Sequence, residues 1–202
     1  MTLFQHAAML AALLLCLPIP ASHAKDAAKR RADAADGASA DSATMNGLHA
    51  MISTAKLDDF KRFREEWYGT PVGHAPHLAT TDRVHRGEPF VVVVAYGGCA
   101  PKDASETDIA AGKVPCAARL DLRMTDPAGK TSLPGNDLSL ADQQPAAPAG
   151  IVQLSPVTLQ ITFDPTDADG LYRIEATVDD PDNDRVLRIA TTVELLPDAS
   201  AP

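Results

Sequence analysis

The most regular hydrophobic pattern in the chain lies between Val157 and Leu195. Three segments in it alternate apolar with polar residues, V-T-L-Q-I-T-F, L-Y-R-I-E-A-T-V and R-V-L-R-I-A-T-T-V-E-L, and the turn-forming sequences D-P-T-D-A-D-G and D-D-P-D-N-D separate them. A period of two is typical of a strand with one buried face. The stretch therefore predicts three strands whose apolar side chains form much of a core.

Further strands are expected upstream. The run from Phe90 to Tyr96 is apolar on both faces and predicts a central strand, and Ala118–Thr125 alternates cleanly before an Asp126–Gly129 turn. Short return or edge strands are expected at 130–133, 138–140 and 151–154. Roughly seven to nine short strands joined by turns, from residue 83 to 197, indicate a mainly β chain folded as an antiparallel β-sandwich.

A different period precedes these strands. In residues 46–68 the apolar residues fall on one helical face and predict an amphipathic helix that ends near Gly69-Thr70-Pro71: Leu48, Met51 or Ile52, Ala55, Phe60, Phe63 and Trp67. Such a stripe indicates that Phe60, Phe63 and Trp67 pack on the sandwich, and a partner-binding helix is the alternative. Residues 69–82 read as an extended connector. Residues 25–45 are rich in Ala and Asp and predict a disordered spacer, since they hold too few large apolar residues to offset the entropy of ordering.

Residues 1–24 have the pattern of a secretory signal peptide. An apolar run is followed by a Pro break and by Ser22-His23-Ala24, with small residues at the −3 and −1 positions. The alternative is an N-terminal membrane anchor, but the apolar run is too short to span a bilayer core of about 30 Å. We expect cleavage after Ala24, no membrane insertion afterwards, and a periplasmic or secreted location.

The charge balance bears on possible partners. The chain holds 27 acidic and 18 basic residues, and residues 126–202 hold thirteen acids against four bases. Such a surface repels phosphate backbones, so we expect no nucleic acid as a partner.

Two cysteines remain after signal cleavage, Cys99 and Cys116. An even pair in an exported protein indicates a disulfide, which here ties the base of the polar loop 100–115. Free or metal-ligating thiols are the alternative. A long loop fixed in this way is a candidate contact surface.

Metal sites are weaker candidates. His74, His77 and His85 could bind zinc or copper, although Pro76 bars a continuous helix between the first two. Asp180, Asp182 and Asp184 begin like a calcium-binding loop, but Arg185 stands where that loop needs Gly. The other acidic turn, 164–169, is expected at the opposite end of the domain because an eight-residue strand separates the two by roughly 26 Å. We expect no cofactor.

Sequence motifs for catalysis are missing. The chain contains no G-x-S-x-G, H-E-x-x-H, P-loop or G-x-G-x-x-G sequence, and a disulfide would remove the thiolate of Cys99 as a nucleophile. We therefore expect a non-enzymatic protein, with a hydrolase or hydrolase inhibitor as a distant alternative.

A family resemblance adds to this picture. Seven motifs occur in a fixed order along the chain: F-x-x-x-W at Phe63–Trp67, V-x-R-G at 84–87, V-V-x-x-x-G-C at 93–99, Cys116 before L-D-L, D-P-A-G at 126–129, Leu154-Ser155 and G-L-Y-R-I-E-A-T-V-D-D at 170–180. In this order they resemble a family of small uncharacterised exported bacterial proteins. The resemblance implies export and an immunoglobulin-like β-sandwich, and it brings no activity. Asp169–Tyr172 is also similar to the tyrosine corner of such domains, although Ala168 and Ile174 replace its usual Asp and Cys.

Together these observations predict an immunoglobulin-like antiparallel β-sandwich with a preceding short helix, acting as a binding or accessory module of the bacterial envelope. The expected partner is an unknown envelope protein. The candidate contact residues are Phe63 and Trp67 on the helix and Lys102 and Asp103 in the tied loop. A periplasmic metal-binding protein and a calcium-stabilised sandwich are the alternatives.

Overall fold

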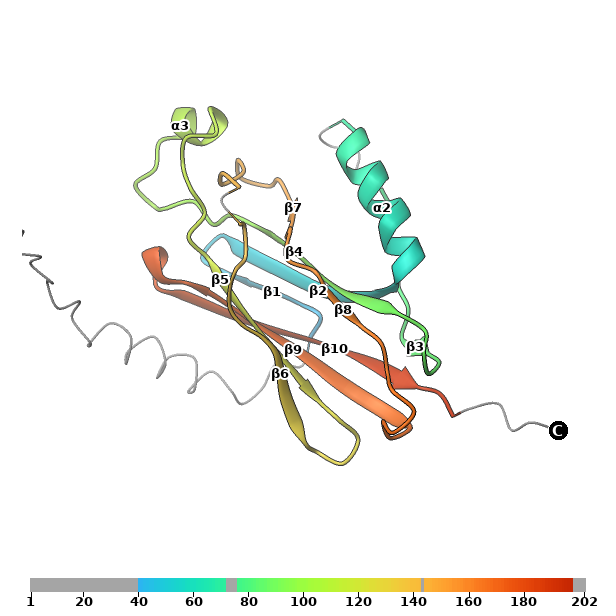
Figure 1. Cartoon of the computed structure of the whole chain (residues 1–202). Helices are drawn as coiled ribbons and strands as arrows, with labels where there is room; N and C mark the ends of the chain where they lie inside the picture. The colour runs from blue at the N-terminus through green and yellow to red at the C-terminus, as the bar shows by residue number, and fades with distance from the viewer. Residues whose placement is uncertain (1–39, 72–75, 143, 198–202) are drawn as a thin grey trace, which may run out of the picture.

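The computed structural model describes residues 40–71, 76–142 and 144–197, and the expected signal peptide, most of the expected spacer and His74 lie outside them. Within this part the chain is mainly β, with strands in two five-stranded sheets (Figure 1). The first sheet contains β1 (Ser42–Met45), β2 (Leu48–Lys56), β4 (Phe90–Gly97), β7 (Gln153–Leu154) and β8 (Leu159–Ile161). The second contains β3 (Arg83–Val84), β5 (Arg119–Thr125), β6 (Thr131–Ser139), β9 (Gly170–Asp180) and β10 (Arg185–Leu195).

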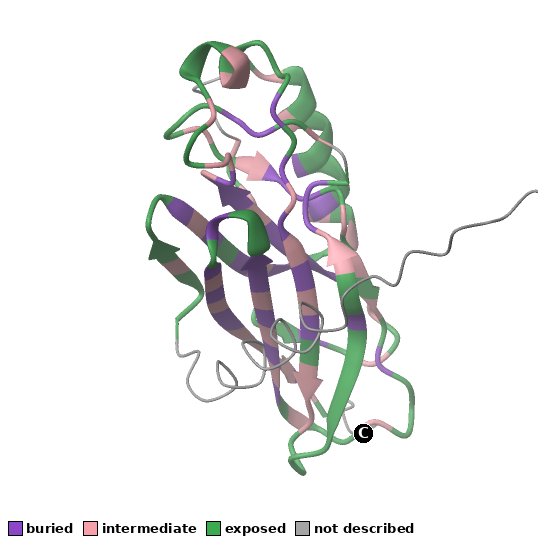
Figure 2. Ribbon diagram, turned by 90° about the vertical axis from the view of Figure 1, so that its left-hand side faces the viewer, coloured by how far each residue is buried: buried purple, intermediate pink, exposed green. Residues whose placement is uncertain are grey.

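The two sheets pack face to face around one core. Along β2, β9 and β10 roughly every second residue points inward, and Figure 2 shows stripes of buried positions along the strands. The largest fully buried side chains include Leu48, Phe90, Tyr96, Leu120, Leu122, Ile174, Ile189 and Leu195. Since these come from both sheets, the alternating pattern in the sequence correctly predicts a sandwich core.

Strand β4 is central in its sheet, as the Val run predicts. It pairs antiparallel with β2 on one side and with β7 and β8 on the other. Its even-numbered residues Phe90, Val92, Val94 and Tyr96 join the core between the sheets, while Val91 and Val93 are buried on the outer face. A strand buried on both faces explains the unbroken run of apolar residues.

The second sheet has the order β3-β10-β9-β5-β6. β9 and β10 form the long hairpin that the sequence predicts, and a 3₁₀ turn, η1 (Pro181–Asn183), joins them. β8, the first of the three alternating segments, lies in the other sheet against β4. β6 lies at one edge of this sheet, and its register against β5 shifts on both sides of Leu122.

The prediction of a helix at 46–68 is correct only for its second half. α2 spans Leu57–Gly69, and residues 48–56 form β2 instead. Residues 42–45 of the expected spacer form β1, which pairs with β2, so sheet structure begins well before residue 83. The reason is tertiary: Leu48, Ala50 and Ile52 face the core in a period of two while β2 hydrogen-bonds to β4 along its length.

Helix α2 covers part of the outer face of the first sheet (Figure 1). Phe60 and Phe63 are buried against Ala55, Val91, Val93 and Leu154. A second short helix, α3 (Glu106–Ala110), lies in the loop after β4. Figure 1 places α3, the segment leading to β7 and the end of α2 at the same end of the molecule. No helix in the described ranges is both long and apolar enough to cross a membrane.

Candidate functional site

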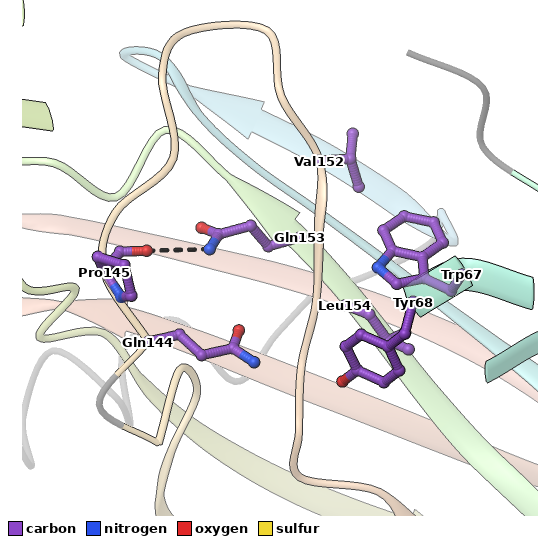
Figure 3. Close-up of a pocket in the computed structure, with 7 residues that line it drawn as sticks. All are labelled: Trp67, Tyr68, Gln144, Pro145, Val152, Gln153 and Leu154. Carbon is purple, nitrogen blue, oxygen red and sulfur yellow. Dashed lines mark hydrogen bonds between the residues drawn. The ribbon is translucent and has the colours of Figure 1, made fainter. Parts of the chain in front are cut away.

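A pocket of about 270 Å³ lies between the end of α2 and the segment around β7 (Figure 3). Its lining combines aromatic, aliphatic and amide side chains: Trp67, Tyr68, Gln144, Pro145, Val152, Gln153 and Leu154. None of these residues carries a formal charge. An apolar pocket with a few placed polar groups is the usual form of a ligand site, and this lining suits a neutral ligand.

The helical wall is fixed by the packing of α2. Phe63 is only 6% exposed, and its ring lies 5.5 Å from that of Trp67. Tyr68 follows on the next helical position and is 64% exposed. Phe63 therefore anchors the helix, whereas Trp67 and Tyr68 face the pocket (Figure 3).

This arrangement corrects one sequence-based expectation. Phe63 was expected at a partner surface together with Trp67, but its side chain is buried against the sheet and cannot be reached by a partner. Trp67 is half-buried and lines the pocket. The spacing of the apolar stripe correctly predicts that Phe60, Phe63 and Trp67 pack on the sandwich.

The opposite wall is held by the amide of Gln153. Its Nε2 donates to the carbonyl oxygen of Pro145 at 2.9 Å, and its Oε1 accepts from the backbone N–H of Ala147 at 3.2 Å (Figure 3). The nitrogen and the oxygen of the Gln153 side-chain amide thus both hold residues 144–147 against β7. This wall is preformed, which lowers the entropy lost when a ligand binds.

The same wall is braced by the loop expected to be a contact surface. The N–H of Ala146 donates to the carbonyl of Val114 at 2.8 Å, and Pro115 and Pro145 form a β-bridge. Cys116 follows directly and is bonded to Cys99, with a Cα–Cα distance of 5.5 Å. The disulfide predicted from the sequence therefore lies one residue from the segment that supports the pocket.

Gln144 is positioned from inside the core. The buried hydroxyl of Tyr96 donates to Oε1 of Gln144 at 3.4 Å. Burial raises the pKa of Tyr96 to about 12, and the nearby Tyr68 adds to this shift. The phenol consequently stays protonated and remains a donor throughout the physiological pH range.

The tied loop 100–115 is fixed at a second point. The backbone N–H of Lys102 donates to Oδ1 of Asn183 at 3.0 Å, and the Asn183 amide donates to the carbonyl of Ala100. Ser105 caps α3 by accepting from the N–H of Asp108. Lys102 and Asp103 are exposed, so their side chains are free to contact a partner.

The candidate calcium residues are placed differently from a calcium loop. Asp180 is fully buried and forms an ion pair with Arg185, while the Asn183 amide donates to both of its carboxylate oxygens. Asp182 and Asp184 are exposed beyond it. The oxygens of Asp180 are therefore already used by the protein. Arg185 also donates to the carbonyl of Asn46 at 2.9 Å, which ties the β1–β2 turn to this end of β10.

The described candidate histidines have no cluster of further ligands around them within the described ranges. His77 and His85 are both exposed, and His74 lies outside the described residues. Over the described ranges no group of three or more His, Cys, Asp or Glu side chains could hold a metal ion. The second acidic turn is held internally, because Arg86 donates to the carbonyl of Asp167 and to the carboxylate of Asp169.

The sequence gives no signal for four of the pocket residues. Gln144, Pro145, Val152 and Gln153 lie in or beside a stretch that reads only as a loop with a short strand. They reach the pocket through pairing of β7 with β4 and through the contact with Val114 and Pro115, both of which are long-range.

Comparison with known proteins identifies no relative in sequence. A scan against protein-family models finds no match, and a search of curated proteins finds none. Among solved structures, a family 123 glycoside hydrolase from Clostridium perfringens is similar with a TM-score of 0.37 and 9% identity, over 75% of this chain and 27% of that chain. The chain thus spans about a quarter of that enzyme's length. At this TM-score the likeness carries no argument about function.

Proposed function

We propose that the protein is an exported, non-enzymatic binding module of the bacterial envelope whose binding site is the pocket between α2 and residues 144–154. The observation that carries the proposal is the exposed aromatic wall. Tyr68 stands 64% exposed beside Trp67, on a helix whose neighbouring residues are anchored in the sandwich. Exposed aromatic side chains on a rigid support are characteristic of binding hot spots.

Within this proposal the sandwich is immunoglobulin-like, and two observations support that. The strands β5, β6, β9 and β10 lie in the order β10-β9-β5-β6, which matches the G-F-C-C′ order of variable-type domains. The hydroxyl of Tyr172 donates to the carbonyl of Ala168 at 2.9 Å, as the tyrosine of a tyrosine corner does. Domains of this architecture commonly use loops at one end for binding, and here the tied loop and the pocket share one end.

Export is supported by the chemistry of the chain. Residues 1–24 have the features of a cleaved signal, and the Cys99–Cys116 bond is compatible with an oxidising compartment. The partner in this proposal is an envelope protein. It would contact the pocket and, in the tied loop, the exposed residues Lys102 and Asp103.

Capture from an envelope extract tests the proposal. The mature protein, immobilised, should retain a specific protein that Tyr68→Ala loses by about ten-fold or more, because an exposed aromatic hot spot contributes 2 kcal/mol or so. Leu133→Ala is the matched control, since Leu133 is 63% exposed on the distant edge strand β6. Equal capture by wild type and Tyr68→Ala would place the binding surface elsewhere.

A further inference from the structure

The pocket presents hydrogen-bond donors that the protein does not use. The indole N–H of Trp67, the hydroxyl of Tyr68 and the Nε2 amide of Gln144 have no hydrogen-bond partner among the described residues. Figure 3 shows these side chains on the two walls of the pocket, with the Tyr68 hydroxyl and the Gln144 amide directed toward one another. An indole or an amide nitrogen can only donate and the Tyr68 hydroxyl can donate as well as accept, so the site offers three donor groups to acceptors on a ligand.

Three acceptors of the opposite wall each have a donor from the protein. The carbonyl of Pro145 accepts from Gln153, the Oε1 of Gln153 accepts from Ala147, and the Oε1 of Gln144 accepts from Tyr96. Each oxygen keeps a second lone pair, but the pocket groups without any protein partner are the three donors, and these favour a ligand that supplies acceptors.

The remaining lining is apolar. Leu154 forms the floor, Val152 is 39% exposed at the rim, and the ring of Trp67 forms a side. The pocket volume suits a few residues of an extended chain rather than a large ligand. A suitable ligand is thus neutral, apolar in outline and rich in acceptors.

We infer that the pocket binds a proline-rich segment of its partner in the polyproline II conformation. Each X-Pro amide has a carbonyl acceptor and no N–H, and the left-handed polyproline helix exposes these carbonyls beside flat apolar rings. Aromatic-lined grooves with hydroxyl and indole donors bind such segments because their conformation is preformed. This inference rests on the proposed function and adds the chemistry of the ligand.

Two other ligand classes match the pocket less well. A saccharide carries hydroxyl groups that each need an acceptor as well as a donor, and it would have to share the Pro145, Gln153 and Gln144 oxygens with the donors they already have. An extended peptide that added a strand would need a free edge on β7, but the Gln153 side chain already joins this two-residue strand to Pro145 and Ala147. A saccharide and an extended peptide without proline are therefore included as comparison ligands in the experiment below.

Fluorescence of the mature protein gives a direct assay, because Trp67 is the only tryptophan in the chain. Titration with acetyl-decaproline amide should produce a saturable change, while an alanine-glycine decapeptide and maltotriose should not. Tyr68→Phe removes one hydroxyl without changing shape, and Gln144→Glu replaces a donor with an acceptor. Each should weaken decaproline binding by about five-fold or more, the effect of one lost hydrogen bond.

Leu133→Ala is the control variant and should bind decaproline like the wild type. The inference is overturned if decaproline leaves the Trp67 emission unchanged, if the other two probes match it, or if Tyr68→Phe and Gln144→Glu bind it normally. Loss of envelope capture in Tyr68→Ala, together with no response to decaproline, would reject the ligand class and keep the binding site. Normal capture by Tyr68→Ala would reject both.

Discussion

Gly98 is the residue at which three parts of the molecule meet. It follows β4, precedes the disulfide-bonded Cys99, and has a φ of +73°. A Cβ at this position would clash with the carbonyl oxygen of Gly47 in the β1–β2 turn. Gly98 therefore supplies both a left-handed backbone and the close approach of another backbone, and only glycine meets the two requirements together.

Substitution at this site should be severe. Gly98→Ala is expected to lower the free energy of unfolding by about 3 kcal/mol, since backbone strain adds to a clash that the turn cannot relieve. Gly129→Ala is the matched control, because Gly129 also has a positive φ, +84°, but nothing within 4 Å of an added Cβ. It should cost only about 1 kcal/mol. Urea denaturation of both variants measures the difference in the free energy of unfolding. Equal losses of stability would show that the backbone at Gly47 moves away from the added Cβ at little cost.

At the scale of elements, the boundary between β2 and α2 shows what periodicity can resolve. The segment Leu48–Ala55 satisfies a helical spacing through Leu48, Met51, Ile52 and Ala55, and a strand spacing through Leu48, Ala50 and Ile52. The local sequence supports both, and pairing with β4 decides between them. From Leu57 onward only the helical spacing remains, and the helix is predicted correctly.

The β9–β10 hairpin ends in a buried ion pair that joins several elements. Asp180 and Arg185 flank η1, Arg185 reaches the carbonyl of Asn46, and Asn183 holds the base of the tied loop. From the sequence these acids read as a solvated turn or a calcium loop, because nothing local indicates that Asp180 is buried. Asp180 is buried because it occupies the next inward-facing position of β9, directly opposite Arg185 on β10.

Breaking this pair should destabilise the whole end of the molecule. Asp180→Asn leaves the Arg185 guanidinium buried without its counter-charge, and the expected loss is about 4 kcal/mol in the free energy of unfolding. Asp58→Asn tests an exposed pair, with Lys61 at 3.1 Å, and should change stability by less than about 0.5 kcal/mol. Thermal denaturation compares the two. If Asp180→Asn left the free energy of unfolding almost unchanged, Asn183 and solvent would be compensating for the lost ion pair.

Across the whole molecule, the disulfide links scaffold and pocket. The Cys99–Cys116 bond closes the loop whose end pairs with residues 145 and 146, on the wall opposite Trp67. Sequence reasoning predicts the bond, the tied loop and the aromatic helix. It does not predict that they share one site, because the residues that connect them carry no motif and are brought in by long-range pairing.

Removing the disulfide should therefore act in two ways. Replacing both cysteines with Ala is expected to lower the free energy of unfolding by about 3 kcal/mol, the chain-entropy value for a loop of this length. The amide of Ala146, bonded to Val114, should in addition lose more hydrogen-exchange protection than the core amide of Ile189. Equal losses at the two amides would show that the bond stabilises the fold without positioning the pocket wall.

The irregular edge of the second sheet affects how copies of the protein associate at high concentration. β6 is the outer strand, it contains Pro134, and its register against β5 shifts twice. A regular edge would offer a ladder of free N–H and C=O groups to a strand of another chain, but a proline and two register shifts interrupt that ladder. In a crowded compartment this edge would thus resist pairing with a strand of a neighbouring molecule.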